Sequence, residues 1–327
     1  MAQLYHIVLM LILMNPTTCY NLLMQWILLC LAAAFLFSIS VFLDNYLIDV
    51  HFKGRQPQAI KVIDAPLYFI LAAIIALVFG LEATPLPIIL IAVVSGLITS
   101  LASIPYYLAL RDEEATTAAI FIQISPVLCI IGDLLILGHT IALQQIYGFI
   151  LILIAPVIVA LSRRSKNARK IEIRASLLLL LYVVLYAIGS ISYAKAELDR
   201  PDVMTLFFWF NIGRASFDTI YSLVSTKSRK RFKQVFKAKP LGFITISVLT
   251  LVVTVIGDFL IRYSYNFAAT SLVSAFANAS ELILTFILGI VLTLLWPKFG
   301  REKLSRHIIA SHLAAVILIV IGIILAN

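Results

Sequence analysis

Residues 87–110 read PIILIAVVSGLITSLASIPYYLAL, a run of 24 residues without a charged side chain. An α-helix needs about 20 apolar residues to cross the roughly 30 Å hydrocarbon core of a bilayer. The run therefore predicts a transmembrane helix. The whole chain has the same character, since 62% of its 327 residues are hydrophobic and only 13% are charged. A water-soluble domain needs a more polar surface, so the sequence predicts an integral membrane protein.

Similar apolar windows, bounded by charged residues, proline or glycine, recur along the chain. They predict an all-α fold of about ten transmembrane helices, at 25–49, 65–82, 87–110, 116–138, 143–162, 175–198, 202–224, 241–264, 269–296 and 307–326. Residues 1–24 are expected to be an N-terminal extension, because their apolar run is short and Asn15-Pro16 interrupts it. A basic linker, 163–174, divides the rest into two five-helix units, 25–162 and 175–327.

Lys and Arg are concentrated in alternate connections. The connections after the first, third, fifth, seventh and ninth spans hold 3, 1, 6, 7 and 4 of the 25 basic residues. Cytoplasmic connections are enriched in Lys and Arg, so these odd-numbered connections are predicted to be cytoplasmic and both termini outside. The expected location is the bacterial cytoplasmic membrane. The net charge of +9 is then explained by topology and by contact with anionic lipid, and no nucleic-acid partner is expected.

The two five-helix units carry matching segments. Residues 115–126 read ATTAAIFIQISP and residues 270–281 read TSLVSAFANASE, and each segment follows a tyrosine-bearing helix end. Small residues also recur seven positions apart, as Gly148 and Ala155 in one unit and Ala315 and Gly322 in the other. Because five is odd, the second unit must be inverted in the membrane. Two inverted repeats are a recurrent plan in secondary transporters, with the binding site near the midplane.

These features resemble the drug/metabolite transporter superfamily, specifically its EamA-type carriers with ten helices. The resemblance is carried by the helix end at 106–110 (YYLAL), by Ser125-Pro126, and by Gly148 and Gly322. It implies an exporter of amino acids, other metabolites or toxic compounds, with a cavity lined by spans 1, 3, 4, 6, 8 and 9. The chain departs from the family at His139, where a Glu is usual, and at Glu281, which stands at the position where the first unit has Pro126.

Ionisable residues at membrane depth are candidates for function, because they are costly there. Arg214 and Glu281 each lie about twelve residues into a span, near the expected midplane. They could face a cavity and bind a zwitterionic solute, or form a structural ion pair, and Glu281 could also carry a coupling proton. Asp258 could pair with Arg262 and Asp218 with Arg214, being four residues apart on one helix face. Asp44 and Asp49 are expected at the interface.

Aromatic and amide groups complete the candidate site. A pocket for a small organic solute is typically aromatic with a few polar groups, although tyrosines at helix ends also anchor proteins at the membrane interface. The candidates for substrate binding or coupling are Arg214, Glu281, Asn278, Asp258, Trp209, Asn211, Tyr106, Tyr107 and Tyr263.

No catalytic or cofactor motif is present in the sequence. It lacks a GxxxxGK[ST] phosphate loop, an HExxH metal pair and a GxSxG nucleophile elbow. The sequence therefore predicts a secondary transporter without cofactor or metal, acting as a monomer or homodimer on a small solute by alternating access. A translocator of a lipid-linked sugar is the alternative, followed by a membrane-embedded lipid-modifying enzyme and a scaffold.

Overall fold

The computed structural model describes residues 16–111, 115–136, 138, 143–162, 173–198, 201–296 and 306–326, and every regular element in them is a helix. In chain order these are α2 (Pro16–Tyr46), the π-helix η1 (Leu47–His51), the 3-10 helix η2 (Pro57–Ile60), α3 (Lys61–Phe79), α4 (Leu86–Leu110), α5 (Ala115–Ile122), α6 (Ser125–Leu135), α7 (Leu143–Ser162), α8 (Ile173–Glu197), α9 (Val203–Val224), α10 (Thr226–Ala238), α11 (Pro240–Ser264), α12 (Thr270–Leu295) and α13 (Arg306–Ala326).

The helices suit a lipid environment. By length and composition, six described stretches are able to cross a membrane, at Gln25–His51, Pro57–Phe79, Leu86–Leu110, Arg174–Glu197, Pro240–Ser264 and Thr270–Leu295. Their outer faces carry exposed leucines, among them Leu77 at 85% exposure and Leu241 at 81%. In water such faces would be unfavourable, whereas lipid tails accommodate them. The chain is thus an integral membrane protein, as predicted.

Helix boundaries agree with the predicted spans to within a few residues, with three exceptions. The helix α2 begins at Pro16, nine residues ahead of the predicted edge, and α3 begins at Lys61 instead of residue 65. The predicted span 116–138 is broken into α5 and α6. His139 and residues 163–172 of the predicted linker 163–174 lie outside the described residues.

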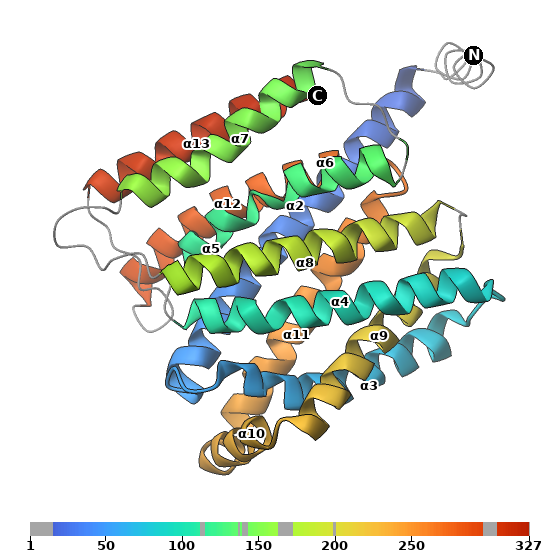
Figure 1. Ribbon diagram of the computed structural model, residues 1–327, viewed down its shortest axis with the longest axis vertical. Helices are drawn as coiled ribbons and strands as arrows, with labels where there is room; N and C mark the ends of the chain where they lie inside the picture. Colours follow the sequence, from blue (N-terminus) through green and yellow to red (C-terminus); the bar gives the residue numbers. More distant parts are fainter. Residues whose placement is uncertain are drawn as a thin grey trace.

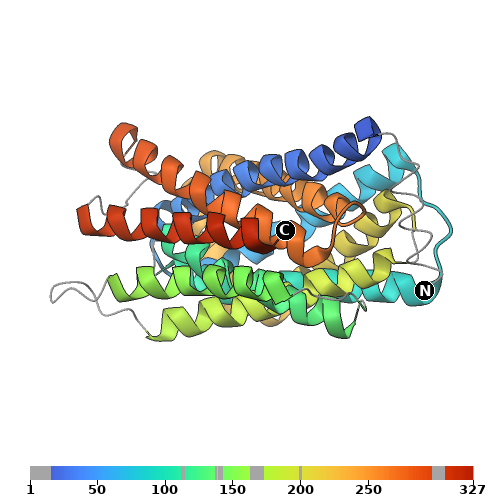
Figure 2. The ribbon, with the colours of Figure 1, turned by 90° about the horizontal axis from the view of Figure 1, so that it is seen from above.

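The helices pack into a bundle in which α2, α4, α8, α11 and α12 are central (Figure 1). Along one edge α7 packs against α13, and along the opposite edge α3 packs against α9. Figure 2 shows α2 and α12 on one side of the molecule and α7 and α8 on the other. The contacts of α2 with α11 and of α4 with α8 connect segments far apart in sequence.

Two glycines allow α4 and α9 to cross with their backbones almost touching. A Cβ atom on Gly96 would lie 1.9 Å from the carbonyl oxygen of Phe210, and one on Gly213 would lie 2.0 Å from that of Val93. Small residues at crossings let membrane helices approach closely, where dispersion contacts replace the missing hydrophobic effect. The crossing fixes the turn of α9 that carries Arg214.

The basic run between 225 and 239, predicted as a connection, is the helix α10. The side chain of Ser225 caps it by accepting a hydrogen bond from the Ser228 backbone N–H at 3.3 Å. Only Ser228 and Val235 of this helix are buried. Its Lys and Arg side chains thus lie on an amphipathic helix, a form that suits a membrane surface.

Candidate functional site

A cavity of about 120 Å³ lies in the centre of the bundle. Such a volume holds several water molecules or a small organic molecule. Its walls come from α2, η2, α3, α4, α5, α8, α9, α11 and α12. The family resemblance implied spans 1, 3, 4, 6, 8 and 9, and each of these six spans contributes to the lining. The helices α3 and α9 contribute as well. Six ionisable side chains of the acidic and basic types line it: Asp44, Lys61, Asp64, Arg214, Asp258 and Glu281.

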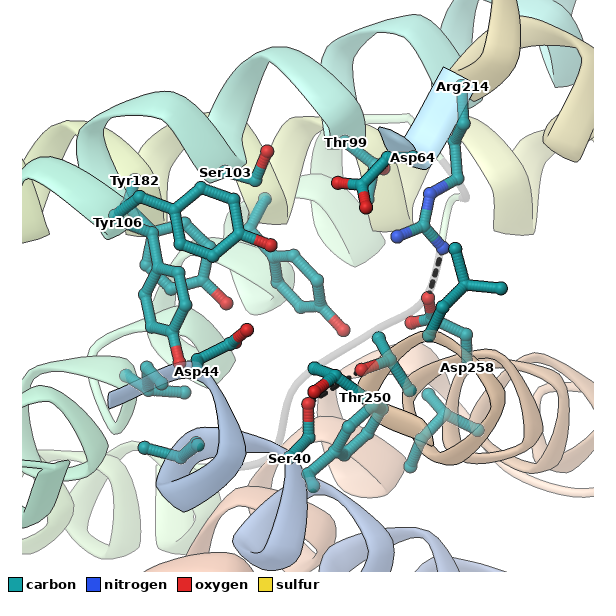
Figure 3. Close-up of a pocket in the computed structure, with 18 of the residues that line it drawn as sticks. Ser40, Asp44, Asp64, Thr99, Ser103, Tyr106, Tyr182, Arg214, Thr250 and Asp258 are labelled. Carbon is teal, nitrogen blue, oxygen red and sulfur yellow. Dashed lines mark hydrogen bonds and ion pairs between the residues drawn. The ribbon is translucent and has the colours of Figure 1, made fainter. Parts of the chain in front are cut away.

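At one end of the cavity Arg214 is held by several groups at once (Figure 3). Its Nη1 donates to Asp258 Oδ2 at 2.5 Å, so α9 and α11 are joined by a buried ion pair. The guanidinium also lies 4.2 Å from the ring centroid of Tyr68. A charge-assisted hydrogen bond and a cation–π contact together compensate part of the cost of burying this cation. The pair is thus Arg214–Asp258, not Arg214–Asp218 or Arg214–Glu281.

The second buried cation is Lys61, at the start of α3, with 1% exposure. Its Nζ lies 3.2 Å from Asp218 and 3.6 Å from Asp64, and it donates to Ser100 Oγ at 3.0 Å. The hydroxyl of Ser100 in turn donates to Asp218. This network ties α3, α4 and α9 together next to Arg214.

At the other end of the cavity, tyrosine rings surround a carboxylate (Figure 3). The rings of Tyr106 and Tyr182 lie 5.0 Å apart between centroids, and the Tyr106 side chain hydrogen-bonds Asp44. Tyr107 and Tyr186 extend the cluster at 5.5 and 5.7 Å. Asp44 lies one turn before η1, where π-helical turns often mark functional sites.

Glu281 lies on α12 with 6% exposure and lines the same cavity. Its turn is fixed to α2, because Ser38 Oγ donates to the Glu281 carbonyl oxygen at 3.1 Å. Among the described residues no Lys or Arg forms an ion pair with its side chain. Glu281 thus differs from Asp258, whose charge is matched.

A broken helix faces Asn278 on the cavity wall. Pro126 cannot donate a backbone hydrogen bond, and its ring would clash with the carbonyl four residues earlier, so α5 ends at Ile122. Asn278 Nδ2 donates to the freed Ile122 carbonyl at 3.3 Å, while Gln123 Nε2 donates to the Asn278 carbonyl at 2.7 Å. Irregular backbone at membrane depth is tolerated where such partners satisfy it.

Six of the nine residues predicted for the site line the cavity: Arg214, Glu281, Asn278, Asp258, Tyr106 and Tyr107. The other three do not. Trp209 packs edge-on against Phe208, Asn211 donates to the Phe207 carbonyl at 2.8 Å, and Tyr263 stacks on Phe259 at the outer surface.

Sequence reasoning missed residues on α2, α3 and α8. Asp44 was expected at the interface, but it is 5% exposed and lines the cavity, because α2 continues past it into η1. Lys61 was counted in a cytoplasmic connection, but it is the first residue of α3 and is buried in the bundle. The charged pair Lys61 and Asp64, one turn apart at the edge of an apolar run, was the available signal.

Arg262 pairs with no neighbour on its own helix and instead lies 3.8 Å from the Phe210 ring centroid.

Within the described part of the chain no group of three or more His, Cys, Asp or Glu side chains could hold a metal ion. Cys30 and Cys129 are buried free thiols.

Two of three comparisons with known proteins gave a match, to a solved structure and to a protein family. No curated protein matches the chain. A solved structure described only as "Crystal structure of protein" has the same fold at a TM-score of 0.54 and 14% identity, covering 90% of this chain and 96% of its own. Residues 24–161 match the EamA-like transporter family. Over that segment the match confirms the sequence resemblance to EamA-type transporters of the drug/metabolite transporter superfamily.

Proposed function

We propose that this protein is a secondary carrier that exports a small metabolite, an amino acid or related organic solute, by alternating access. The observation that carries the proposal is the polar cavity at the centre of an apolar membrane bundle, beside a broken helix. Discontinuous helices at midplane sites are a feature of secondary transporters. The EamA-like match supports transport over enzymatic chemistry.

The mechanism rests on two inverted five-helix units, α2 to α7 and α8 to α13. The packing pattern supports them, because the α2–α11 contact has its counterpart in α8–α4 when the units are exchanged. The matching segments 115–126 and 270–281 support them too. Gln123 and Asn278 hold equivalent positions in those segments, and each donates to backbone of the other's segment. Rocking of one unit against the other would expose the cavity to each side in turn.

Orientation follows from the basic residues. We place α10 and the other connections rich in Lys and Arg in the cytoplasm and both termini outside, in the bacterial cytoplasmic membrane. The side chains of α10 would then contact anionic head groups of the inner leaflet. A reporter fused to the C-terminus should behave as extracytoplasmic, and a cytoplasmic signal would contradict this orientation.

The test of transport uses purified protein in proteoliposomes. Labelled amino acids and related amines are loaded, and efflux is followed with and without a pH gradient. We expect saturable flux of at least one solute, lost in Glu281→Gln and retained in Glu82→Gln, because Glu82 is exposed in the connection between α3 and α4.

Absence of flux across the panel, with protein shown to be folded and inserted, would contradict the carrier. Translocation of a lipid-linked sugar would then be measured on the same vesicles. A monomer or homodimer is compatible with the proposal, since one chain encloses the whole cavity.

A further inference from the structure

The charges that line the cavity do not balance. Four carboxylates, Asp44, Asp64, Asp258 and Glu281, face two cations, Lys61 and Arg214. With every group ionised the described lining carries a formal charge of −2. A buried excess of one sign is unfavourable unless something neutralises it.

Both cations are already engaged by carboxylates. Arg214 is bonded to Asp258 at 2.5 Å, and Lys61 is shared between Asp218 at 3.2 Å and Asp64 at 3.6 Å. Arg214 Nε has no hydrogen-bond partner among the described residues, but a negative group bound there would share a guanidinium that Asp258 already neutralises. The cavity therefore offers a negative group no cation whose charge is not already shared with a carboxylate.

Asp44 and Glu281 are the two lining carboxylates that form no ion pair among the described residues. Asp44 is 5% exposed, and within the described residues its Oδ1 atom has no hydrogen-bond partner. Glu281, at 6% exposure, forms no ion pair there. The Tyr106 side chain hydrogen-bonds Asp44, and both carboxylates act electrostatically on Tyr106 and Tyr182.

Those rings form a wall suited to a cation. Tyr106, Tyr107, Tyr182 and Tyr186 make a continuous chain of ring contacts, with centroids 5.0–5.7 Å apart. Faces of aromatic rings attract ammonium groups, more strongly when the site excludes water. The protein uses the same chemistry at the other end of the cavity, where Tyr68 lies against the Arg214 guanidinium.

We propose that the occupant of the cavity is a small organic cation, an amine or quaternary ammonium compound, held between Asp44 and Glu281 on the tyrosine wall. The inference rests on the proposed carrier function and narrows its substrate class. With a neutral solute the two carboxylates would have to be neutralised by protons alone, and the negative end of a zwitterion would meet only cations that are already paired with carboxylates. A cation satisfies both carboxylates and the rings together.

The test is equilibrium binding to the purified protein in detergent. Binding is measured by calorimetry and by the shift in the protein's unfolding temperature. The probes are tetramethylammonium, choline and phenethylamine. Choline is compared with 3,3-dimethylbutan-1-ol, which has the same shape but carbon in place of the charged nitrogen. We expect at least one of the cations to bind, and choline to bind at least about tenfold more tightly than 3,3-dimethylbutan-1-ol.

Variants locate the site. Asp44→Asn and Glu281→Gln should each weaken cation binding by about tenfold, while Glu82→Gln, outside the cavity, should leave it unchanged. Retention of binding in both cavity variants would overturn the assignment, as would equal affinity for the cation and its neutral isostere, or no binding of any cation in the panel.

The outcomes also separate this inference from the carrier function. Saturable flux of a neutral, zwitterionic or anionic solute, with no flux of any cation, would overturn the cation assignment and leave the carrier intact. Cation binding without flux of the bound compound in proteoliposomes would support the ligand class and contradict the carrier.

Discussion

The two ends of the cavity treat buried charge in opposite ways. Around Arg214 and Lys61 every charge has a partner, and the partners come from different helices, so the groups connect α3, α4, α9 and α11. Among the described residues no Lys or Arg forms an ion pair with Asp44 or Glu281, and tyrosine rings line that end of the cavity. A matched group stabilises the fold, whereas an unmatched group in a cavity is available to a ligand. The comparison therefore separates paired from unpaired charges, and our proposal that only the unpaired ones bind a ligand can be tested one substitution at a time.

The largest loss of stability is expected at the end of the cavity where Arg214 and Lys61 are paired with carboxylates. Arg214→Met would leave Asp258 buried without its partner, which costs about 3–5 kcal/mol of unfolding free energy. Thermal unfolding in detergent and the folded yield measure this loss. Adding Asp258→Asn should restore most of it, and Lys230→Met on the exposed face of α10 should have little effect. Normal stability of Arg214→Met would remove the distinction between the two ends.

A smaller effect is expected at the helix crossing that positions Arg214. Gly96→Ala would place a methyl group against the Phe210 carbonyl, forcing α4 and α9 apart at a cost of about 1–3 kcal/mol. Gly242→Ala is the matched control, because its nearest neighbour would be His51 Cε1 at 3.8 Å. Equal unfolding temperatures for the two variants would show that the close crossing is not needed.

A still smaller loss of stability is expected from a substitution beside the break between α5 and α6. Asn278→Ala removes the donor to the Ile122 carbonyl and should cost about 0.5–2 kcal/mol. Gln234→Ala, an exposed amide on α10, serves as the control. Unchanged stability together with unchanged flux would mean that another group, such as water, satisfies the carbonyl.

The smallest change in stability is expected at the unmatched end. Asp44→Asn removes a buried charge without leaving an unpaired counter-ion behind. The free energy of unfolding, measured without ligand, should therefore change by less than about 1 kcal/mol. The same variant should lose cation binding. A destabilisation as large as that of Arg214→Met would instead place Asp44 among the structural charges.

The helices themselves were predictable, because hydropathy is a local property. Residues 87–110 alone require a membrane-spanning helix, and α4 occupies Leu86–Leu110. Arg214, Glu281 and Asp258 were identified as candidates because charge inside an apolar span is visible in sequence. The break after Ile122 was not predicted, although Pro126 was its signal. Trp209 and Tyr263 were misjudged, since composition does not reveal which face of a helix is turned inward.

By itself the sequence determined that this chain is a membrane protein built of apolar helices, and which few ionisable residues lie inside them. The pairing of those residues was decided only in the tertiary structure. Lys61 meets Asp218 across 157 positions of sequence and Arg214 meets Asp258 across 44. Periodicity along one helix contains no information on how that helix is rotated against its neighbours. Packing fixes this rotation, and with it which carboxylates have a cationic partner and which do not.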